Sequence, residues 1–310
     1  MFATLSPNFD KVAAVIILYN PDISLLDRLL RSVIGQVERT YIIDNTPGST
    51  ADLSSFFDQY HGNISYIPLG DNKGIATAQN IGIRKCMDAG CSHVLLLDQD
   101  SALPTHAVTK LLAAEKALLR LNIKVGAVGP QFIDEKTGKS APAIRHRWFR
   151  IDKLHLDMKS SDPVETDHLI ASGALIQTSV LRLVGLMRDD LFIDWVDIEW
   201  GLRAKHKGYS SFYVPNVVMQ HSVGDSAIRV FGRDVHLHSD VRNYYMLRNA
   251  VYLMRLRSMG WKWKINFAPR IPIYLFLYPY LSNNKRTNLR LVLRALLDGA
   301  RGKLGGYARR

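Results

Sequence analysis

The sequence predicts an α/β fold with a mostly parallel central sheet, and three observations support this. Short apolar runs alternate with longer amphipathic segments over the first 130 residues, and strands that alternate with helices form parallel sheets with right-handed crossovers. The runs VAAVIIL and HVLLL are almost continuously apolar, as expected of strands buried on both faces. Polar residues follow these runs directly, where open α/β sheets bind their ligands.

The first half of the chain is expected to contain five strands with helices between them. The strand-length apolar runs are Val12–Tyr19, Thr40–Asp44, Ile64–Pro68, His93–Leu97 and Lys124–Val128. The intervening amphipathic segments are Ile23–Gly35, Ser49–Tyr60, Gly74–Ala89 and Thr105–Leu121. In the first of these segments, the helical period places five apolar residues on one face: Leu25, Leu26, Leu29, Leu30 and Val33.

The second half is less regular. The charged stretch Asp134–Asp167 has no clear period, and we interpret it as a long connection or small hairpin that crosses the mouth of the site. A strand at Thr166–Ile170, helices near Ser179–Gly185 and from Asp194, two strands at Tyr209–Val214 and Val217–His221, and a helix at Val235–Arg257 are expected next. We divide the chain into a ligand-binding and catalytic domain, residues 1–234, and a basic helical extension, residues 235–310.

Composition excludes several classes of protein. The 310 residues are 47% hydrophobic and 22% charged, unlike disordered chains. Two cysteines, Cys86 and Cys91, exclude a disulfide scaffold or a Cys-rich zinc module and fit a reducing compartment. The N-terminal segment lacks a basic stretch and a small-residue cleavage site, so we expect no signal peptide and a cytoplasmic protein.

The net charge of +12 is concentrated near the C-terminus. Residues 242–310 carry 15 of the 40 Lys and Arg residues but one acidic residue, Asp298. Such a segment points to an anionic surface, a membrane or a nucleic acid. Aromatic residues interleaved with the cations favour peripheral association with an anionic membrane, and no nucleic-acid-binding motif accompanies the charge. The apolar run Ile271–Leu281 is too short to span a bilayer; alternatively, it packs on the body or across a homo-oligomer.

Polar residues at the strand ends are the first candidate site. They are Tyr19 and Asn20, Asp44 and Asn45, Asn72, Lys73 and Gly74, and Asp98, Gln99 and Asp100. Any one Asn or Asp could simply cap the next helix, but Asp98 and Asp100 precede no immediate helix. Two carboxylates at a strand end suit Mg²⁺ or Mn²⁺ with substrate phosphate. Phosphate-loop and dinucleotide-binding glycine motifs are absent.

A second candidate is the segment FIDWVDIEWGLR. Asp197 stands close to Trp195 and Trp200, which suits a carboxylate base next to a ring-shaped substrate, although acidic residues also stabilise the first turn of a helix. Glu199 is expected to pair with Arg203 on the surface, four residues on. His221 ends a predicted strand and is either structural or part of a metal site.

Taken together, these residues resemble the inverting family 2 glycosyltransferases of the GT-A fold, most closely their bacterial rhamnosyltransferase branch. The matching pieces are VIILYNP, IIDN, GDNKGIATAQNIGI, LLLDQDS, ASGALI, FIDWVDIEWGLRAKHKGY, QHSVGDS and YYMLRN. They cover the chain from about Val12 to Met254 in the family's order. The resemblance implies a Rossmann-like, mostly parallel sheet flanked by helices.

The resemblance also implies roles for particular residues. The nucleotide-sugar donor would lie against Tyr19, Asn20, Asp44, Asn45, Asn72, Lys73, Gly74, Asn80, Asp98 and Gln99, and the sugars against Gly173, Trp195, Trp200 and Arg203. A divalent metal would bind Asp98, Asp100 and His221, and Asp197 falls on the position of the catalytic base. Val196 stands where many members of the family carry an acidic residue.

We therefore expect an inverting enzyme that moves rhamnose from dTDP-rhamnose to a lipid-linked cell-surface glycan at the inner face of the plasma membrane. A carboxylate would take the proton of the acceptor hydroxyl, while a divalent metal offsets charge on the departing diphosphate. One alternative is a hexosyl or N-acetylhexosaminyl transferase that uses a UDP-sugar. Another is a non-catalytic protein that binds sugar nucleotides or nucleic acid.

Overall fold

The computed structural model describes residues 10–48, 53–134, 138, 140–221, 227–230, 233–236, 239–282 and 284–307. Its strands are β1 (Val12–Leu18), β2 (Arg39–Asp44), β3 (Ile64–Pro68), β4 (His93–Asp98), β5 (Ser101–Ala102), β6 (Val125–Asp134), β7 (Ala143–Arg147), β8 (Arg150–Leu154), β9 (Val164–Thr166), β10 (Leu175–Gln177), β11 (Ser210–His221), β12 (Ala227–Val230) and β13 (Arg233–His236). Its α-helices are α1 (Ile23–Val33), α2 (Ser54–Phe57), α3 (Ile75–Asp88), α4 (Ala107–Arg120), α5 (Thr178–Val184), α6 (Val196–His206), α7 (Asp240–Leu253), α8 (Gly260–Phe267), α9 (Arg270–Leu281) and α10 (Lys285–Arg301).

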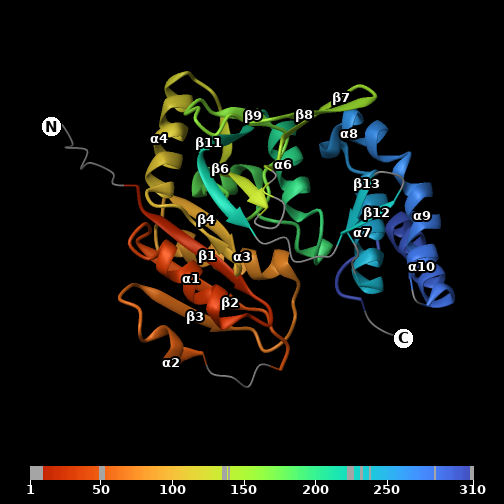
Figure 1. Ribbon diagram of the computed structural model, residues 1–310, viewed down its shortest axis with the longest axis horizontal. Helices are drawn as coiled ribbons and strands as arrows, with labels where there is room; N and C mark the ends of the chain where they lie inside the picture. The colour runs from red at the N-terminus through yellow and green to blue at the C-terminus, as the bar shows by residue number, and fades with distance from the viewer. Residues whose placement is uncertain are drawn as a thin grey trace.

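A nine-stranded sheet forms the centre of the body, with helices packed against it (Figure 1). Its order is β3-β2-β1-β4-β10-β6-β11-β5, and β9 pairs with β11. The pairs β2–β3, β1–β2, β1–β4 and β6–β11 are parallel, whereas β10 runs antiparallel to both of its neighbours. The predicted α/β class with a mostly parallel sheet is therefore confirmed.

The parallel register brings the predicted strand ends together. Leu18 of β1 pairs with Asp44 of β2, and Ile17 pairs with Asp98 of β4. All seven residues of β1 are buried, as expected of a central strand whose sheet is covered on both faces. The polar residues that follow β1, β2 and β4 consequently meet at one edge of the sheet.

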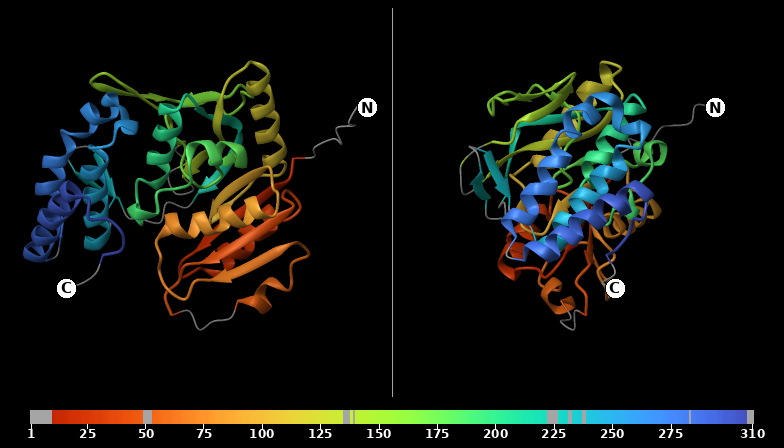
Figure 2. Two further views of the ribbon diagram at one scale, coloured as in Figure 1. Left: turned by 180° about the vertical axis from the view of Figure 1, so that it is seen from behind. Right: turned by 90° about the vertical axis from the view of Figure 1, so that its right-hand side faces the viewer.

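Helices α7–α10 stand beside the body (Figure 2). Helix α10 packs along α7, and Tyr244, Tyr245 and Val292 belong to a small core between the helices. Ala250 and Leu253 of α7 and Trp263 of α8 belong instead to the main core of the body. Shared apolar contacts therefore anchor these helices in the body. No helix in the described ranges is long and apolar enough to cross a membrane.

Several predicted boundaries were wrong. The segment 233–236 is strand β13, paired with β12, and α7 begins later, at Asp240, where the Ser239 hydroxyl accepts from the Arg242 amide at 3.3 Å. The two strands expected between 209 and 221 are one strand, β11, with an irregularity between Val214 and Val218 that absorbs the Pro215–Asn216 step. The stretch after Asp134 contains the β7–β8 hairpin, as expected.

Candidate active site

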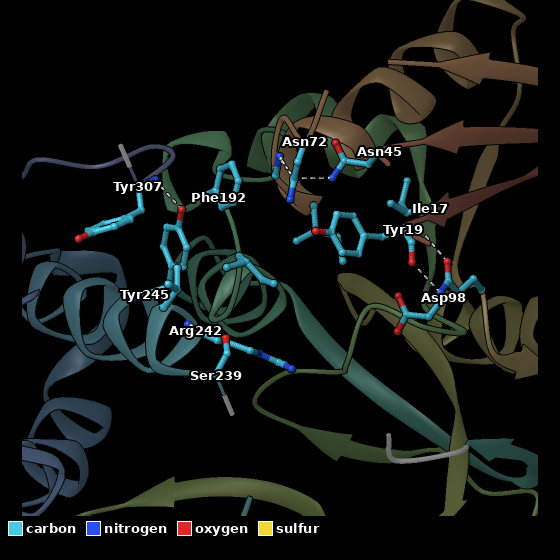
Figure 3. A pocket seen from close by; sticks show the side chains of 15 residues that line it. Ile17, Tyr19, Asn45, Asn72, Asp98, Phe192, Ser239, Arg242, Tyr245 and Tyr307 are labelled. Atoms are coloured by element: carbon cyan, nitrogen blue, oxygen red, sulfur yellow. Dashed lines mark hydrogen bonds between the residues drawn. The ribbon is translucent and has the colours of Figure 1, made fainter. Parts of the chain in front are cut away.

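A cavity of about 640 Å³ lies between the carboxyl-end edge of the sheet and helix α7 (Figure 3). One wall comes from the sheet edge and the other from the segment before α6, from α7 and from the last described residues. The lining residues are Ile17, Tyr19, Asn45, Asn72, Gly74, Ile75, Asp98, Gln99, Phe192, Ile193, Ser239, Val241, Arg242, Tyr245 and Tyr307. Six of the residues predicted to bind a nucleotide sugar thus line one cavity.

Side-chain hydrogen bonds hold the sheet wall together. Gln99 accepts from the Tyr19 amide at 2.8 Å and donates to the Tyr19 carbonyl at 3.1 Å, which ties the end of β4 to the end of β1. Asn45 donates to Asn72 Oδ1 at 3.0 Å, and the same oxygen accepts from the Gly74 amide at 2.9 Å. These bonds preorganise the wall before any ligand arrives, which lowers the entropic cost of binding.

Gly74 allows the two walls to approach each other. Its φ of 85° and ψ of 151° lie in a region that is essentially restricted to glycine. A Cβ at this position would lie 2.6 Å from the Phe192 ring and 2.7 Å from the Phe192 carbonyl oxygen. The loop before α3 therefore needs glycine for both its backbone conformation and its contact with Phe192.

Four residues predicted for the donor site do not line the cavity. Asp44 is 1% exposed and accepts from the Tyr66 hydroxyl at 2.7 Å and the Thr46 amide at 2.9 Å. Asn80 is buried in α3 and bonds both the amide and the carbonyl of Met187. Asn20 is exposed, and Lys73 pairs with Asp71. In this conformation Asp44 and Asn80 support the walls from behind.

The predicted metal residues gather around the end of β4. Asp98 lines the cavity beside Tyr19 (Figure 3), and β5, which follows Asp100 directly, pairs with β11 in a register that sets His221 opposite Ser101. The side chain of His221 lies outside the described part of the structure. Among the described residues, no three His, Cys, Asp or Glu side chains form a metal-binding group. Two carboxylates and a neighbouring histidine position are nevertheless a donor set that fits Mg²⁺ or Mn²⁺.

Asp197 lies on the first turn of α6. Its carboxylate accepts from the Ile198 amide at 2.8 Å and from the Ala171 amide, and it lines a cavity of about 20 Å³ that is separate from the large one. Burial raises the pKa of Asp197 above its ordinary value. The next residue after Ala171, Ser172, accepts from the Asp98 amide at 3.1 Å, so one short segment joins the predicted base to the predicted metal turn.

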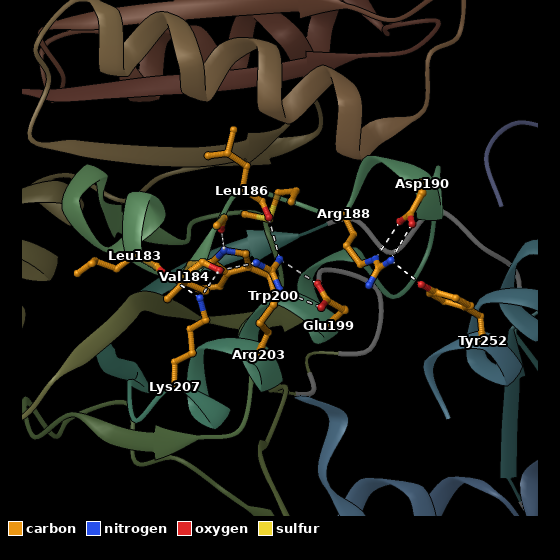
Figure 4. A network of polar contacts seen from close by, with 12 residues as sticks. Leu183, Val184, Leu186, Arg188, Asp190, Glu199, Trp200, Arg203, Lys207 and Tyr252 are labelled. Carbon is orange, nitrogen blue, oxygen red and sulfur yellow. Dashed lines mark hydrogen bonds and ion pairs between the residues drawn. The ribbon is translucent and has the colours of Figure 1, made fainter. Parts of the chain in front are cut away.

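Trp200 and Arg203 do not line the large cavity. Figure 4 shows both residues within a network of polar contacts. Trp200 is buried and donates to the Gly185 carbonyl at 2.9 Å. Arg203 donates to the Val184 and Leu186 carbonyls, each at 2.7 Å, and to Glu199. The expected Glu199–Arg203 pair forms, but its predicted surface location was wrong, because Glu199 is fully buried.

Gly173 lies two residues after Ala171, whose amide donates to Asp197. Its φ is 81°, and a Cβ would lie 2.5 Å from Pro130 Cγ. The Gly173 amide donates to the Leu96 carbonyl at 2.7 Å. Gly173 therefore shapes the backbone next to β4 and does not line the large cavity.

The segment before α6 departs from the expected helix, which begins at Val196 and not at Asp194. Phe192, Asp194 and Trp195 all have positive φ values, between 61° and 69°, which is costly for residues with side chains. Asn249 of α7 holds this segment by donating to the Leu191 and Ile193 carbonyls at 2.9 and 2.8 Å. Its Oδ1 accepts from Arg248 Nε at 2.9 Å. The buried Arg248–Asn249 pair thus fixes the wall formed by Phe192 and Ile193.

The sequence interpretation missed the wall formed by the C-terminal region. Arg242 pairs with Asp194 at 3.2 Å, and the Tyr307 amide donates to the Tyr245 hydroxyl at 2.6 Å. Figure 3 shows Arg242 and Tyr245 on the wall opposite the sheet edge, with Tyr307 next to Tyr245. The YYMLRN motif was the available signal, since it is one of the pieces that resemble the family and lies in this region.

The chain is similar to known proteins in both sequence and fold. The sequence profile of glycosyl transferase family 2 matches residues 13–183. The dTDP-rhamnosyl transferase RfbF of Shigella flexneri is 32% identical over 298 residues, 95% of this chain and 97% of that protein. The N-acetylglucosaminyl-diphospho-decaprenol L-rhamnosyltransferase of Mycobacterium tuberculosis is 24% identical and covers 91% of this chain and 98% of its own. The structure of GalNAc-T7 with UDP, GalNAc and Mn²⁺ superposes with a TM-score of 0.63 at 16% identity, covering 96% of this chain and 57% of that longer one.

Proposed function

The chain belongs to glycosyl transferase family 2, and from that premise we propose that it transfers a rhamnosyl residue from dTDP-rhamnose to a hydroxyl of a lipid-linked glycan. The observation that carries the proposal is the cavity between the sheet edge and α7, because strand-end residues of β1, β2 and β4 all line it. The name of the Shigella relative supports rhamnose as the transferred sugar. A UDP-sugar donor remains the alternative within the same family.

In this proposal the sheet wall binds the nucleotide part of the donor. The Tyr19 side chain is half-exposed at the cavity, where its ring can stack on a base, and Asn45 and Asn72 offer amides to ribose or base. The cationic side chain of Arg242 on the opposite wall can attract the diphosphate. A nucleotide sugar would therefore lie across the carboxyl ends of β1, β2 and β4.

Asp98, Asp100 and His221 would hold a divalent metal. When bound, the metal offsets the negative charge that develops on the departing nucleoside diphosphate. Asp98 lines the cavity, and the backbone register sets His221 next to the Asp98–Asp100 turn. Both Mg²⁺ and Mn²⁺ suit carboxylate ligands of this kind.

Asp197 would act as the general base that takes the proton of the acceptor hydroxyl. Its raised pKa makes it a stronger proton acceptor than an exposed aspartate. The Ala171 and Ile198 amides orient its carboxylate. Attack by the deprotonating hydroxyl on the anomeric carbon, opposite the departing diphosphate, inverts the configuration there.

The C-terminal extension would associate with an anionic membrane, where a lipid-linked acceptor resides. Exposed aromatic side chains lie on α8 and α9, with Trp261 70%, Phe276 74% and Tyr280 72% exposed. Lys262 and Lys264 are close to the first of these in sequence. Rings at headgroup depth beside cations match the chemistry of anionic lipids. The enzyme would then work at the cytoplasmic face of the membrane.

The Asp197→Asn variant tests the proposed base. We expect transfer to be abolished while the affinity for donor changes little, because Asp197 does not line the large cavity. Donor affinity is measured by calorimetry and transfer by release of the nucleoside diphosphate. A variant that retains wild-type turnover would contradict the assignment of the base.

A thermal-shift panel of nucleotide sugars, with and without Mg²⁺ or Mn²⁺, tests the donor. A donor present at 100 times its Kd adds about 2.7 kcal/mol to the free energy of unfolding. We expect dTDP-rhamnose to give this stabilisation and the metal to strengthen it. If a UDP-sugar stabilises the protein and dTDP-rhamnose does not, the proposed donor is wrong.

A further inference from the structure

A second cavity, of about 270 Å³, lies on the other side of the segment that precedes α6. It is enclosed by the β7–β8 hairpin, the first turn of α6, and α8 with the start of α9. Asn266 of α8 donates to the Arg147 carbonyl at 2.7 Å and so ties the hairpin to the helix. Of the lining residues, six matter for its chemistry: Lys153, His168, Trp195, Trp263, Phe267 and Arg270.

Three aromatic rings form one wall of the second cavity. Trp263 and Phe267 stack with ring centroids 5.0 Å apart and planes 1° apart. The Trp195 ring meets both edge-on, at 5.6 and 4.8 Å, and its Nε1 donates to the Met246 carbonyl at 2.9 Å. An apolar aromatic wall that is fixed in this way suits the C–H faces of a sugar ring, as ligand pockets combine aromatic surface with a few polar groups.

Polar and cationic groups complete the second cavity. Lys153 and Arg270 are exposed at its rim, and neither pairs with a carboxylate within the described ranges. His168 Nδ1 is buried and has no hydrogen-bond partner in that same part of the chain. Burial lowers the pKa of His168 to about 4, so its ring is neutral at pH 7 and can bond an uncharged hydroxyl. The second cavity thus has two cations, Lys153 and Arg270, that can bind an anionic group, and a neutral imidazole, His168, that can bind a sugar hydroxyl.

The two cavities share the segment that carries the proposed base. Phe192 and Ile193 line the large cavity, whereas Trp195 and Ile198 line the second one. Asp197 lies between Trp195 and Ile198 in sequence, on the first turn of α6. An inverting displacement needs donor and acceptor on opposite sides of the reacting carbon, so a donor in the first cavity leaves the second for the acceptor.

We propose, building on the function proposed above, that the second cavity binds the sugar-diphosphate head of the lipid-linked acceptor. The sugar packs against Trp195 and the stacked rings, and the diphosphate binds Lys153 and Arg270. The same elements carry exposed aromatic side chains: Trp148 and Phe149 at the hairpin tip are 57% and 81% exposed, and Trp261 in the first turn of α8 is 70% exposed. These rings provide an apolar surface for the lipid part of the acceptor. A soluble nucleotide sugar has no lipid part and would not need such a surface.

The double variant Lys153→Gln/Arg270→Gln tests the proposal, with Arg286→Gln/Arg290→Gln on α10 as its matched control. Both variants remove two exposed cations, but the control residues line neither cavity. We expect the KM for the lipid-linked acceptor to rise about tenfold or more in the cavity variant, since charged hydrogen bonds are lost, while the KM for donor stays constant. An equal rise in both variants, or a rise in the KM for donor, would overturn the proposal.

Vesicle binding gives a readout that needs no turnover. The wild-type chain should sediment more strongly with phosphatidylcholine vesicles that contain a polyprenyl-diphosphate-linked sugar than with vesicles that lack it. We expect the cavity variant to lose this difference and the control to keep it, and excess nucleotide sugar not to compete. If the difference persists in the cavity variant, the cavity is not the acceptor site, whatever the outcome of the donor experiments.

Discussion

The buried Asn249 side chain connects the stability of the protein to its catalytic geometry. It is fully buried, and its Nδ2 donates to the Leu191 and Ile193 carbonyls and, at a longer 3.3 Å, to the Asp194 carbonyl. Its Oδ1 accepts from the Nε and Nη2 atoms of Arg248 at 2.9 and 2.8 Å. In Asn249→Ala the two shorter carbonyl bonds cost about 1 kcal/mol each, and the orphaned charged donors cost about 1–2 kcal/mol more. The expected loss of about 3–4 kcal/mol leaves a typical domain folded.

The functional effect of Asn249→Ala should exceed its effect on stability. Without Asn249 the positive-φ residues Phe192, Asp194 and Trp195 can relax to less strained conformations. Displacement of this segment moves both a wall of the large cavity and the turn that carries Asp197. A shift of about 1 Å in catalytic geometry can cost about 100-fold in rate, and we expect kcat/KM to fall by at least that factor.

Urea denaturation and steady-state kinetics at a temperature where the variant is folded measure the two effects of Asn249→Ala. Thr178→Val is the matched control, since its buried hydroxyl donates to the Cys91 carbonyl at 3.0 Å at the opposite edge of the sheet. The control should lose about 1–2 kcal/mol of stability with unchanged kcat/KM. If Asn249→Ala kept wild-type kcat/KM while folded, the proposed link between α7 and the catalytic segment would be refuted.

Two further predictions concern Gly74 and Asp197. Gly74→Ala should lose about 2–4 kcal/mol of stability from backbone strain and overpacking and should bind the donor poorly. The control Gly70→Ala, with a φ of 70° and open space around its Cβ, should lose about 1–2 kcal/mol and bind the donor normally. Equal urea midpoints for the two variants would contradict this prediction. Because the pKa of Asp197 is raised in the folded state, its stabilising contribution is present below the unfolded pKa and lost as pH rises through the folded value. Asp197→Asn should therefore be more stable than the wild type at pH 7 and lose this advantage in acid. The kcat/KM of the wild type should fall as the pH drops through the raised pKa of Asp197. An Asp197→Asn variant that is less stable than the wild type at pH 7 would show this reasoning to be wrong.

The sheet could be predicted from the sequence because its determinants are local. The apolar run of β1 and the leucine face of α1 predict which side chains are buried. Parallel pairing of the strands then brings the strand-end residues to the same edge of the sheet. Six of the predicted donor residues line one cavity for this reason. Asp44 also ends a strand, but its side chain accepts from Tyr66 and Thr46. Asn80, which the family resemblance predicted, lies within α3 and bonds Met187.

The C-terminal wall could not be predicted because it depends on contacts between distant residues. Asn249 bonds residues more than 50 positions away, and these bonds stop the helical pattern of α6 from extending back to Asp194. Likewise, Val235 fits a helical period but pairs with Ile228 in a two-stranded sheet. The excess of basic residues in this region indicated membrane association. The contribution of the region to the wall of the large cavity was therefore not predicted.

Transfer from dTDP-rhamnose is the measurement that tests the account most directly. The purified chain, Mg²⁺ or Mn²⁺, dTDP-rhamnose and a polyprenyl-diphosphate-linked sugar are incubated together, and the anomeric configuration of the product is determined by NMR. The account predicts one rhamnosyl residue added with inversion, and no product with Asp197→Asn. Retention of configuration, or consumption of a UDP-sugar in place of dTDP-rhamnose, would contradict it.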